Sequence, residues 1–375
     1  MIIQDFMREM VKRNSSDIYI TAELPPMYRT EGVTEPWGTE KFTPEQTKEL
    51  AYSIMNERQK KKFEGKMEMN LALYFPELGR FRVNIFVQRG CVGIVIRLIK
   101  LEIETIDHLG LPNSLKDIIM TKRGMVLIVG ATGSGKSTSL AAMIDHRNSN
   151  LSGHIISIED PIEFVHQHKK SVITQREIGF DTHSFREALR NTLRQAPDVI
   201  LIGEIRDTET MESAITFAET GHLCLGTLHA NNANQAIERI MNFFPVERHP
   251  QIYLLLSLNI KAIISQRLIP TVEGKRTAAF EILTDTPRVK DLILKGEVGV
   301  LKEVMAAGTQ EGMQTFDQSL FYLYKSGKIT YDNAIAYADS ANDLRLRIKM
   351  DEIGDRKDEE GPAFKIKSDA PLKRR

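Results

Sequence analysis

The alternation of apolar and polar residues in the first hundred positions predicts a pair of β-strands. In residues 79–87 (GRFRVNIFV), Phe81, Val83, Ile85 and Val87 fall on one face, and Arg80, Arg82 and Asn84 fall on the opposite face. This pattern is typical of a half-buried strand. Residues 91–99 (CVGIVIRLI) predict a second strand, on which Arg97 shares a face with apolar neighbours. An arginine in such a pattern either faces solvent or reaches an anionic group.

An amphipathic helix is predicted before these strands. Residues 43–65 begin with Thr43 as the N-cap, Pro44 at the first helical position and Gln46 completing a capping box. The apolar residues that follow recur at helical spacing, so the whole stretch is predicted as one helix. The helix and the strands together indicate a small α+β domain over residues 1–104.

Residues 105–114 carry Gly, Pro and Asn and are predicted to be a linker. Beyond the linker, short apolar runs alternate with helical patterns such as those of residues 185–195 and 207–219. Alternating strands and helices predict an α/β domain with a mainly parallel sheet, whose ligands bind at the carboxyl ends of the strands. The predicted strands are residues 126–129, 154–158, 198–202 and 222–228.

The pattern becomes helical from about residue 245, through residues 250–269 and 315–327. The second domain with its C-terminal helices is therefore predicted over residues 115–345. The last stretch, residues 346–375, is charged and poor in bulky apolar residues, and we predict that it is a disordered tail.

Composition excludes several classes of protein. Lys+Arg and Asp+Glu both number 50, so no overall charge draws the chain to nucleic acid. The chain has 2 cysteines, too few for a four-cysteine metal cage, and two reduced thiols are favoured over a disulfide. The apolar runs are far shorter than the roughly 18 residues of a membrane span. The N-terminus lacks the apolar core of a signal peptide, so we expect a cytoplasmic chain.

Residues 130–137 (GATGSGKS) match the phosphate-binding pattern G-x-x-x-x-G-K-[ST] between a predicted strand and a predicted helix. The glycines let backbone N–H groups point at phosphate oxygens, the lysine adds a positive charge, and the helix N-terminus adds its dipole. The hydroxyl of Ser137 is a ligand for Mg²⁺. The motif predicts ATP as the ligand of Gly130, Ala131, Thr132, Gly133, Ser134, Gly135, Lys136, Ser137 and Thr138.

Acidic residues follow two of the predicted strands. The apolar run of DVILIGEIRD ends at Glu204, whose carboxylate can hold Mg²⁺ directly or through water, or polarise the attacking water. ISIEDPIEF carries Glu159, Asp160 and Glu163, and of these Glu163 is predicted to orient or deprotonate that water. The sequence leaves open which of Glu163 and Glu204 is the general base.

Histidines and arginines complete the set of candidates. His222 and His229 flank a predicted strand, where they could sense the γ-phosphate or simply be satisfied core residues. Arg186, Arg190 and Arg194 recur at i, i+4 and i+8 on a predicted helix. For the first two a solvated face is favoured. Arg194, ten residues before the strand-end glutamate, is predicted to lie near the site.

In their order, four segments resemble the Walker A, Asp, Walker B and His boxes of secretion-superfamily ATPases: GATGSGKST, IEDPIE, LRQAPDVILIGEIRD and TGHLCLGTLHANNA. SSDIYI, FRVNIF and IRLI also match, so the resemblance covers residues 1–345. It implies a RecA-like P-loop ATPase domain, preceded by a PAS-like domain and followed by a helical C-terminal region.

Within that superfamily the chain resembles the type IV pilus retraction ATPases of the PilT/PilU type, and it is most similar to the PilU branch at residues 286–297 and 312–330 and in its charged tail. Pilus assembly and type II secretion ATPases typically carry a four-cysteine insert, which 2 cysteines cannot form. PilT usually has an AIRNLIRE-like helix where this chain has PRVKDLILKGE, so the chain is expected to drive retraction alone or as a helper to a PilT partner.

The resemblance implies a homohexameric motor for pilus retraction and twitching motility, peripheral to the inner membrane at the pilus base. The implied partners are a PilT-like paralogue and a platform protein of the inner membrane. Arg82 and Arg97 match the family's arginine sensors.

Three other functions are considered. A pilus assembly or type II secretion ATPase is disfavoured by the missing insert. A nucleic-acid translocase is disfavoured by the balanced charge and by the absence of a groove that combines aromatic and basic residues. A non-catalytic regulatory subunit that only binds nucleotide is disfavoured by the intact Walker and acidic boxes.

Overall fold

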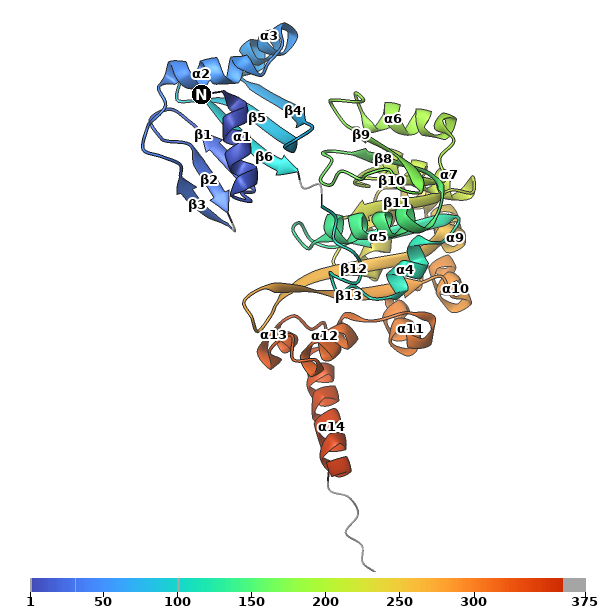
Figure 1. The fold of residues 1–375 in the computed structure, drawn as a ribbon. Coiled ribbons are helices and arrows are strands. Elements are labelled where there is room, and N and C mark those ends of the chain that lie inside the picture. Colours follow the sequence, from blue (N-terminus) through green and yellow to red (C-terminus); the bar gives the residue numbers. More distant parts are fainter. Residues whose placement is uncertain (1, 31, 100–101, 360–375) are drawn as a thin grey trace, which may run out of the picture. The chain divides into compact units, whose positions relative to one another are not determined.

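The computed structural model describes residues 2–30, 32–99 and 102–359 (Figure 1). Contacts divide the chain into two compact units. The first takes in Met1–Val126 and Lys136–Leu228, and the second takes in Leu127–Gly135 and the chain from His229 onward.

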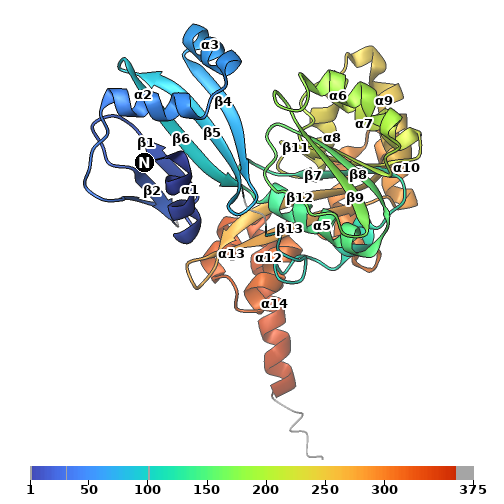
Figure 2. The ribbon, with the colours of Figure 1, turned by 45° about the horizontal axis from the view of Figure 1, so that its top comes forward.

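The first unit contains an antiparallel sheet of six strands in the order β3-β2-β1-β6-β5-β4. Helices α1 and α2 lie across one face of this sheet (Figure 2). We call the sheet and its helices the small domain. Its elements are α1 (Ile3–Lys12), β1 (Asp17–Ile20), β2 (Met27–Thr30), β3 (Val33–Pro36), α2 (Pro44–Ser53), α3 (Glu57–Lys66), β4 (Glu68–Phe75), β5 (Gly79–Gln88) and β6 (Cys91–Ile99).

The alternation on β5 positions the core of the small domain as predicted. Phe81 and Val83 are fully buried and pack with Phe6 of α1 in one apolar cluster. Arg82 and its polar neighbours occupy the other face of the strand. Burying one large apolar side chain of this kind contributes about 1.5–3 kcal/mol, so the cluster is the main source of stability here.

The predicted capping box of α2 is confirmed. The Thr43 side chain accepts from the N–H of Gln46, and the Gln46 side chain accepts in turn from the N–H of Thr43. The prediction of one continuous helix over residues 43–65 is wrong, because α2 ends at Ser53. A second capping box, formed by Asn56 and Gln59, starts α3 as a separate helix.

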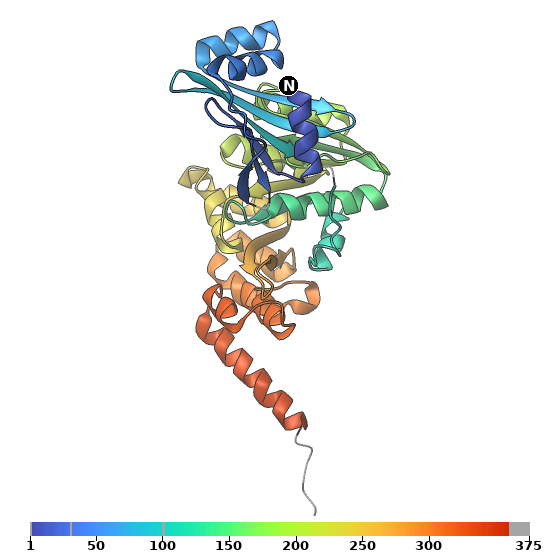
Figure 3. The ribbon, with the colours of Figure 1, turned by 60° about the vertical axis from the view of Figure 1, so that its left-hand side comes forward.

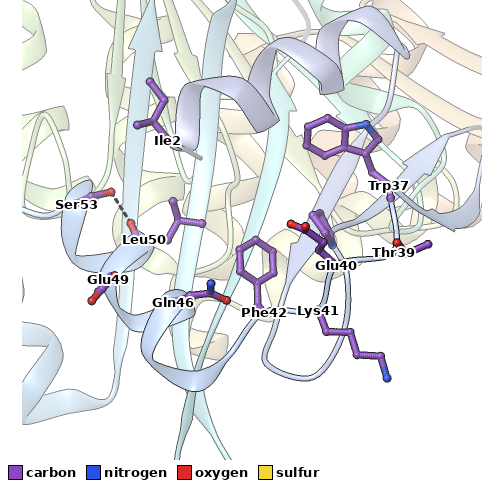
Figure 4. A pocket seen from close by; sticks show the side chains of 12 residues that line it. Ile2, Trp37, Thr39, Glu40, Lys41, Phe42, Gln46, Glu49, Leu50 and Ser53 are labelled. Carbon is purple, nitrogen blue, oxygen red and sulfur yellow. Dashed lines mark hydrogen bonds between the residues drawn. The ribbon is translucent and has the colours of Figure 1, made fainter.

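A hollow of about 710 Å³ lies between α2, Ile2 and the loop before α2 (Figure 4). Trp37 lines it, and the indole makes edge-on contacts with the rings of Phe6 and Tyr28, at centroid distances of 5.7 and 5.9 Å. Phe42 and Leu50 add apolar surface to the hollow.

The remainder of the first unit follows the predicted βα alternation. Strands β9, β8, β10 and β11 pair in parallel. Every residue of β7, β10 and β11 is buried, which explains why these strands are continuous apolar runs rather than alternating ones. The elements are α4 (Ser114–Ile119), β7 (Gly124–Val129, whose residues from Leu127 onward are assigned to the second unit), α5 (Lys136–Asn150), β8 (Gly153–Glu159), β9 (Ser171–Glu177), α6 (Phe185–Thr192), β10 (Val199–Ile202), α7 (Thr208–Glu219) and β11 (Leu223–Leu228).

The second unit contains an antiparallel strand pair and most of the C-terminal helices. The larger sheet has seven strands in the order β13-β12-β7-β11-β10-β8-β9. The main elements of the second unit are α8 (Ala233–Met241), α9 (His249–Asn259), β12 (Ile260–Pro270), β13 (Arg276–Thr284), α10 (Pro287–Lys295), α11 (Leu301–Ala307), α12 (Phe316–Lys325), α13 (Tyr331–Ala336) and α14 (Ala341–Glu359).

The helical prediction for residues 250–269 is wrong in its second half. Helix α9 ends at Asn259, and the chain continues as strand β12. The strand is rich in isoleucine, with Ile263 and Ile264 buried, and it pairs with β13 along its length. Branched side chains favour the extended conformation, and a short apolar run does not distinguish a buried strand from a helix.

The prediction of a disordered tail from residue 346 is also wrong for its first part. Helix α14 extends to Glu359 (Figure 3). Leu344 and Ile348 belong to one apolar cluster with Phe316 and Leu320 of α12, and this cluster anchors the helix. The rest of the predicted tail, residues 360–375, lies outside the described residues.

Two further features bear on the predicted organisation. Within the predicted linker, residues 105–113 contain turns but neither helix nor strand, and Ser114 opens α4. Among the described residues, no helix combines the length and the apolar character that crossing a bilayer requires.

Candidate functional site

The phosphate-binding motif forms the loop between β7 and α5. A Cβ atom on Gly130 would lie 2.5 Å from Ser134 Oγ and 2.7 Å from the carbonyl oxygen of Gln266. A Cβ on Gly135 would lie 2.8 Å from Gln266 Nε2. At Gly130 the backbone carbonyl leaves no room for a side chain, and at Gly135 a φ of +86° lies in the left-handed region that favours glycine. At the tip, Ala131, Thr132 and Gly133 are exposed.

Replacing Gly130 with alanine is expected to lower the free energy of unfolding by about 1–3 kcal/mol, because the backbone carbonyl of Gln266 cannot move aside cheaply. Thermal unfolding and the affinity for a nucleotide analogue would both be measured. Gly299→Ala is the matched control, since a Cβ there meets nothing within 4 Å, and it should change stability by less than about 0.5 kcal/mol. Equal stability of the two variants would contradict this account of the loop.

Two buried polar atoms of the second unit suit a ligand that both accepts and donates hydrogen bonds, because Ser134 Oγ can donate to a phosphate oxygen whereas Gln266 Oε1 can only accept. Ser134 Oγ and Gln266 Oε1 are buried and have no hydrogen-bond partner among the described residues. Leaving such atoms unsatisfied is costly, so a partner from a ligand is expected. Gln266, on β12, was missed by the sequence analysis because its segment was predicted as helix. The signal was a lone amide within an apolar run.

Lys136, the first residue of α5, is brought close to both predicted acids. Its side chain is 9% exposed, and this burial lowers the pKa of Lys136. The charges of Glu163 and Glu204 act in the opposite direction and favour the charged amine. A lysine near two carboxylates at the start of a helix is suited to bind a phosphate chain and neutralise part of its charge.

The residues after Lys136 could supply one or two ligands to a magnesium ion. Ser137 and Thr138 lie in the first turn of α5. Among the described residues, no group of three or more His, Cys, Asp or Glu side chains is placed to hold a metal. Mg²⁺ in nucleotide sites takes one or two protein ligands and completes its shell with phosphate oxygens and water. Ser137 and Glu204 are the residues that could supply those ligands.

Residues 160–163, which follow β8, are here called the acidic loop. The carboxylate of Glu159, just before this loop, accepts hydrogen bonds from Ser157 Oγ at 2.5 Å and from Gln175 Nε2 at 3.1 Å. It also accepts the backbone N–H of Glu163, and its burial raises the pKa of Glu159. Glu159 therefore holds the loop in place, and Glu163 remains the candidate for acting on water.

The two histidines differ in their surroundings. His222 comes before the amino end of β11, and its Nδ1 contacts Thr220 Oγ1 at 3.0 Å and the carbonyl oxygen of Phe217 at 3.2 Å, which ties it to the end of α7. His229 follows the carboxyl end of β11. In the second unit it lines a hollow of about 340 Å³ together with Ala131 of the phosphate loop. Only His229 lies beside that loop.

A second hollow, of about 440 Å³, borders the phosphate loop within the second unit. It combines the polar backbone of the loop with cationic, aromatic and apolar side chains, which suits an organic phosphate. Its lining comprises residues 130–134 together with Asn231, Gln266, Arg267, Leu268, Pro270, Arg276 and Tyr337.

Arg82 and Arg97 lie directly opposite each other in the ladder between β5 and β6. Both side chains are on the face of the sheet away from the small-domain core. Arg97 Nε donates to Asp17 Oδ1 at 2.7 Å, although the arginine side chain is 65% exposed. Arg97 is therefore exposed but already paired, and Arg82 is half-buried on the same face of the sheet.

The place of Arg194 near the site stays a prediction. Arg194 is exposed in a short 3₁₀ turn before the amino end of β10, whereas Glu204 follows the carboxyl end of that strand. The extended strand between the two residues separates them along the chain by its length.

The phosphate loop is rich in glycine, and a buried lysine begins the helix that follows it. Acidic residues follow the parallel strands. Together these features define the class of P-loop nucleotide-hydrolysing proteins. The sequence also matches the model of the type II/IV secretion system protein family over residues 1–334.

Comparison with known proteins shows which kind of P-loop protein the chain resembles. Over 380 aligned residues, covering 100% of both chains, the sequence is 54% identical to the type IV pilus ATPase PilU of Pseudomonas aeruginosa. It is 42% identical to the pilus retraction ATPase PilT of the same organism, over 89% of this chain and 97% of that one. A crystal structure of the pilus retraction motor PilT with bound ADP superposes with a TM-score of 0.86 at 40% identity, covering 92% of this chain and 99% of that one.

The chain therefore belongs to the type II/IV secretion system protein family and is an ATPase of the PilT/PilU type. The predicted α/β fold and the predicted resemblance to this family are confirmed.

Proposed function

We propose that this ATPase powers the retraction of type IV pili and thereby twitching motility. The observation that carries the proposal is the 54% identity to PilU over the full length of both chains. The similarity to PilT, a retraction ATPase by name, supports the same direction of movement.

In the proposed reaction, Gly133, Gly135 and Thr138 hold the phosphates of ATP with Lys136. Ser137 and Glu204 would hold Mg²⁺, which when bound neutralises charge on the β- and γ-phosphate oxygens. Glu163 orients or deprotonates the attacking water, and His229 contacts the γ-phosphate. The proximity of Glu163 and Glu204 to Lys136 supports these roles.

The proposed assembly is a ring of six copies, in which the small domain of each copy meets the ATPase domain of the next. Arg82 and Arg97 would then neutralise charge that develops on the phosphates and couple hydrolysis to domain rotation. The 65% exposure of the Arg97 side chain supports a contact of this kind. The proposed partners are a PilT-like paralogue and a platform protein, at the cytoplasmic side of the inner membrane.

Deleting the gene tests the direction of the motor. Surplus pili that do not retract are expected on the deletion strain, because assembly would continue unopposed. Pili would be counted by electron microscopy, and twitching would be scored as the spread of colonies. Bald cells would instead indicate an assembly motor, and a normal pilus count with normal twitching would contradict the proposal.

A further inference from the structure

A buried carboxylate at the end of β9 links the small domain to the acidic loop. Glu177 is 2% exposed, and the two hydrogen bonds that its carboxylate accepts from described residues end on the same oxygen. Arg80 Nη2, from β5, donates to Glu177 Oε2 at 3.1 Å, and the backbone N–H of Ile162 donates to it at 3.3 Å. All three residues belong to the first compact unit.

The positive charge of Arg80 offsets the cost of burying an ionised Glu177 carboxylate. Burial raises the pKa of Glu177, and the charge of Arg80 is the largest influence that lowers it again. Arg82 adds a smaller effect of the same sign, and Asp181 acts in the opposite direction. Removing one partner of a buried ion pair typically costs more than removing both, because an uncompensated charge is left behind.

Because Glu177 binds the N–H of Ile162, the acidic loop also depends on the charge of Arg80. Ile162 is 1% exposed and directly precedes Glu163. The next N–H along the chain, that of Glu163, is bound by the carboxylate of Glu159, which lies opposite Glu177 in the β8–β9 register. Two neighbouring carboxylates therefore hold consecutive N–H groups of the loop, and only the one from Glu177 depends on a residue of the small domain.

We propose that Arg80 is a positioning residue for ATP hydrolysis: by compensating Glu177 it lets this carboxylate hold Ile162, and with it the loop that carries Glu163. This inference rests on the role proposed for Glu163. Loss of the Arg80–Glu177 pair leaves an unpaired buried carboxylate, which takes up a proton or moves toward water and releases the loop. The Arg80–Glu177 pair thus couples the position of the small domain to the position of Glu163, the residue that acts on water.

Four full-length variants test the link by steady-state ATP hydrolysis. Arg80→Ala should lower kcat about tenfold or more, with KM for ATP within about twofold, because the loop orients the reaction rather than binding nucleotide. Arg80→Lys, which keeps the charge, should recover most of the loss. The side chain introduced by Glu177→Gln is neutral and needs no compensating cation, so this variant should lose less kcat than Arg80→Ala. The double variant should resemble Glu177→Gln alone.

Hydrogen exchange gives a readout that does not depend on turnover. The amide of Ile162 should exchange faster in Arg80→Ala than in the parent protein, because its acceptor is no longer fixed. Arg8→Ala is the matched control, since Arg8 forms an exposed pair with Asp5 on the small domain, with side chains 57% and 41% exposed. It should change neither kcat nor the exchange of Ile162.

Parental kcat and exchange in Arg80→Ala would overturn the proposal, as would kcat losses that multiply in the double variant. Should Arg80→Ala fail to fold, as judged by its thermal unfolding, Arg80→Lys and Glu177→Gln still decide the question through exchange at Ile162. Glu163→Gln is measured alongside. If Glu163→Gln retains turnover, the role proposed for Glu163 is refuted. If Glu163→Gln loses turnover while Arg80→Ala has parental kcat, only the positioning role of Arg80 is refuted.

Discussion

Replacing Lys136 with alanine is expected to abolish ATP turnover, by at least about 10³-fold in kcat, in the full-length protein. The lysine begins α5 at the end of the phosphate loop, is 9% exposed and lies near two acids. Without it the phosphates would meet those acids with no opposing side-chain charge at this position. Phosphate release at saturating ATP and magnesium measures the loss.

Lys295→Ala is the matched control for this experiment. Lys295 is 53% exposed in an ion pair with Asp291 on α10, and its replacement should leave turnover unchanged. Undiminished hydrolysis in the Lys136 variant would refute the assignment of the loop as the catalytic phosphate site.

Replacing Glu163 with glutamine is expected to lower kcat by about 10²–10⁴-fold while nucleotide affinity is retained, because a general base acts in the chemical step and not in binding. Glutamine preserves the size of the side chain, so the acidic loop should keep its backbone contacts. Turnover and the binding of a fluorescent nucleotide analogue would be measured on the same preparation.

Glu204→Gln, studied in parallel, separates the two candidate roles. If Glu204 helps to hold Mg²⁺, its variant should need more magnesium for half-maximal turnover, and excess magnesium should restore part of the rate. A Glu163 variant with parental kcat, beside a Glu204 variant that no magnesium concentration rescues, would transfer the role of base to Glu204.

The features that sequence predicted well depend on neighbours along the chain. The capping box of Thr43 and Gln46, the alternation around Phe81 and the glycine-rich loop before Lys136 each need only a few consecutive residues. Their residue types restrict the backbone directly, through side-chain caps, one-sided burial or the absence of a Cβ. Such features predicted both the fold class and the phosphate loop.

The features that sequence missed depend on partners far along the chain. Strand β12 forms because β13 pairs with it, and α14 is held by a cluster that includes Phe316. Arg80 and Glu177 are 97 residues apart, and no local pattern marks them as a pair.

The hollow beside Trp37 has a practical consequence for spectroscopy. The chain has 1 tryptophan, and it lies in the small domain in edge contact with Phe6 and Tyr28. Light selectively absorbed by indole therefore yields fluorescence from that domain alone. Its emission maximum should therefore report the unfolding of this domain during heating, without any dye being attached.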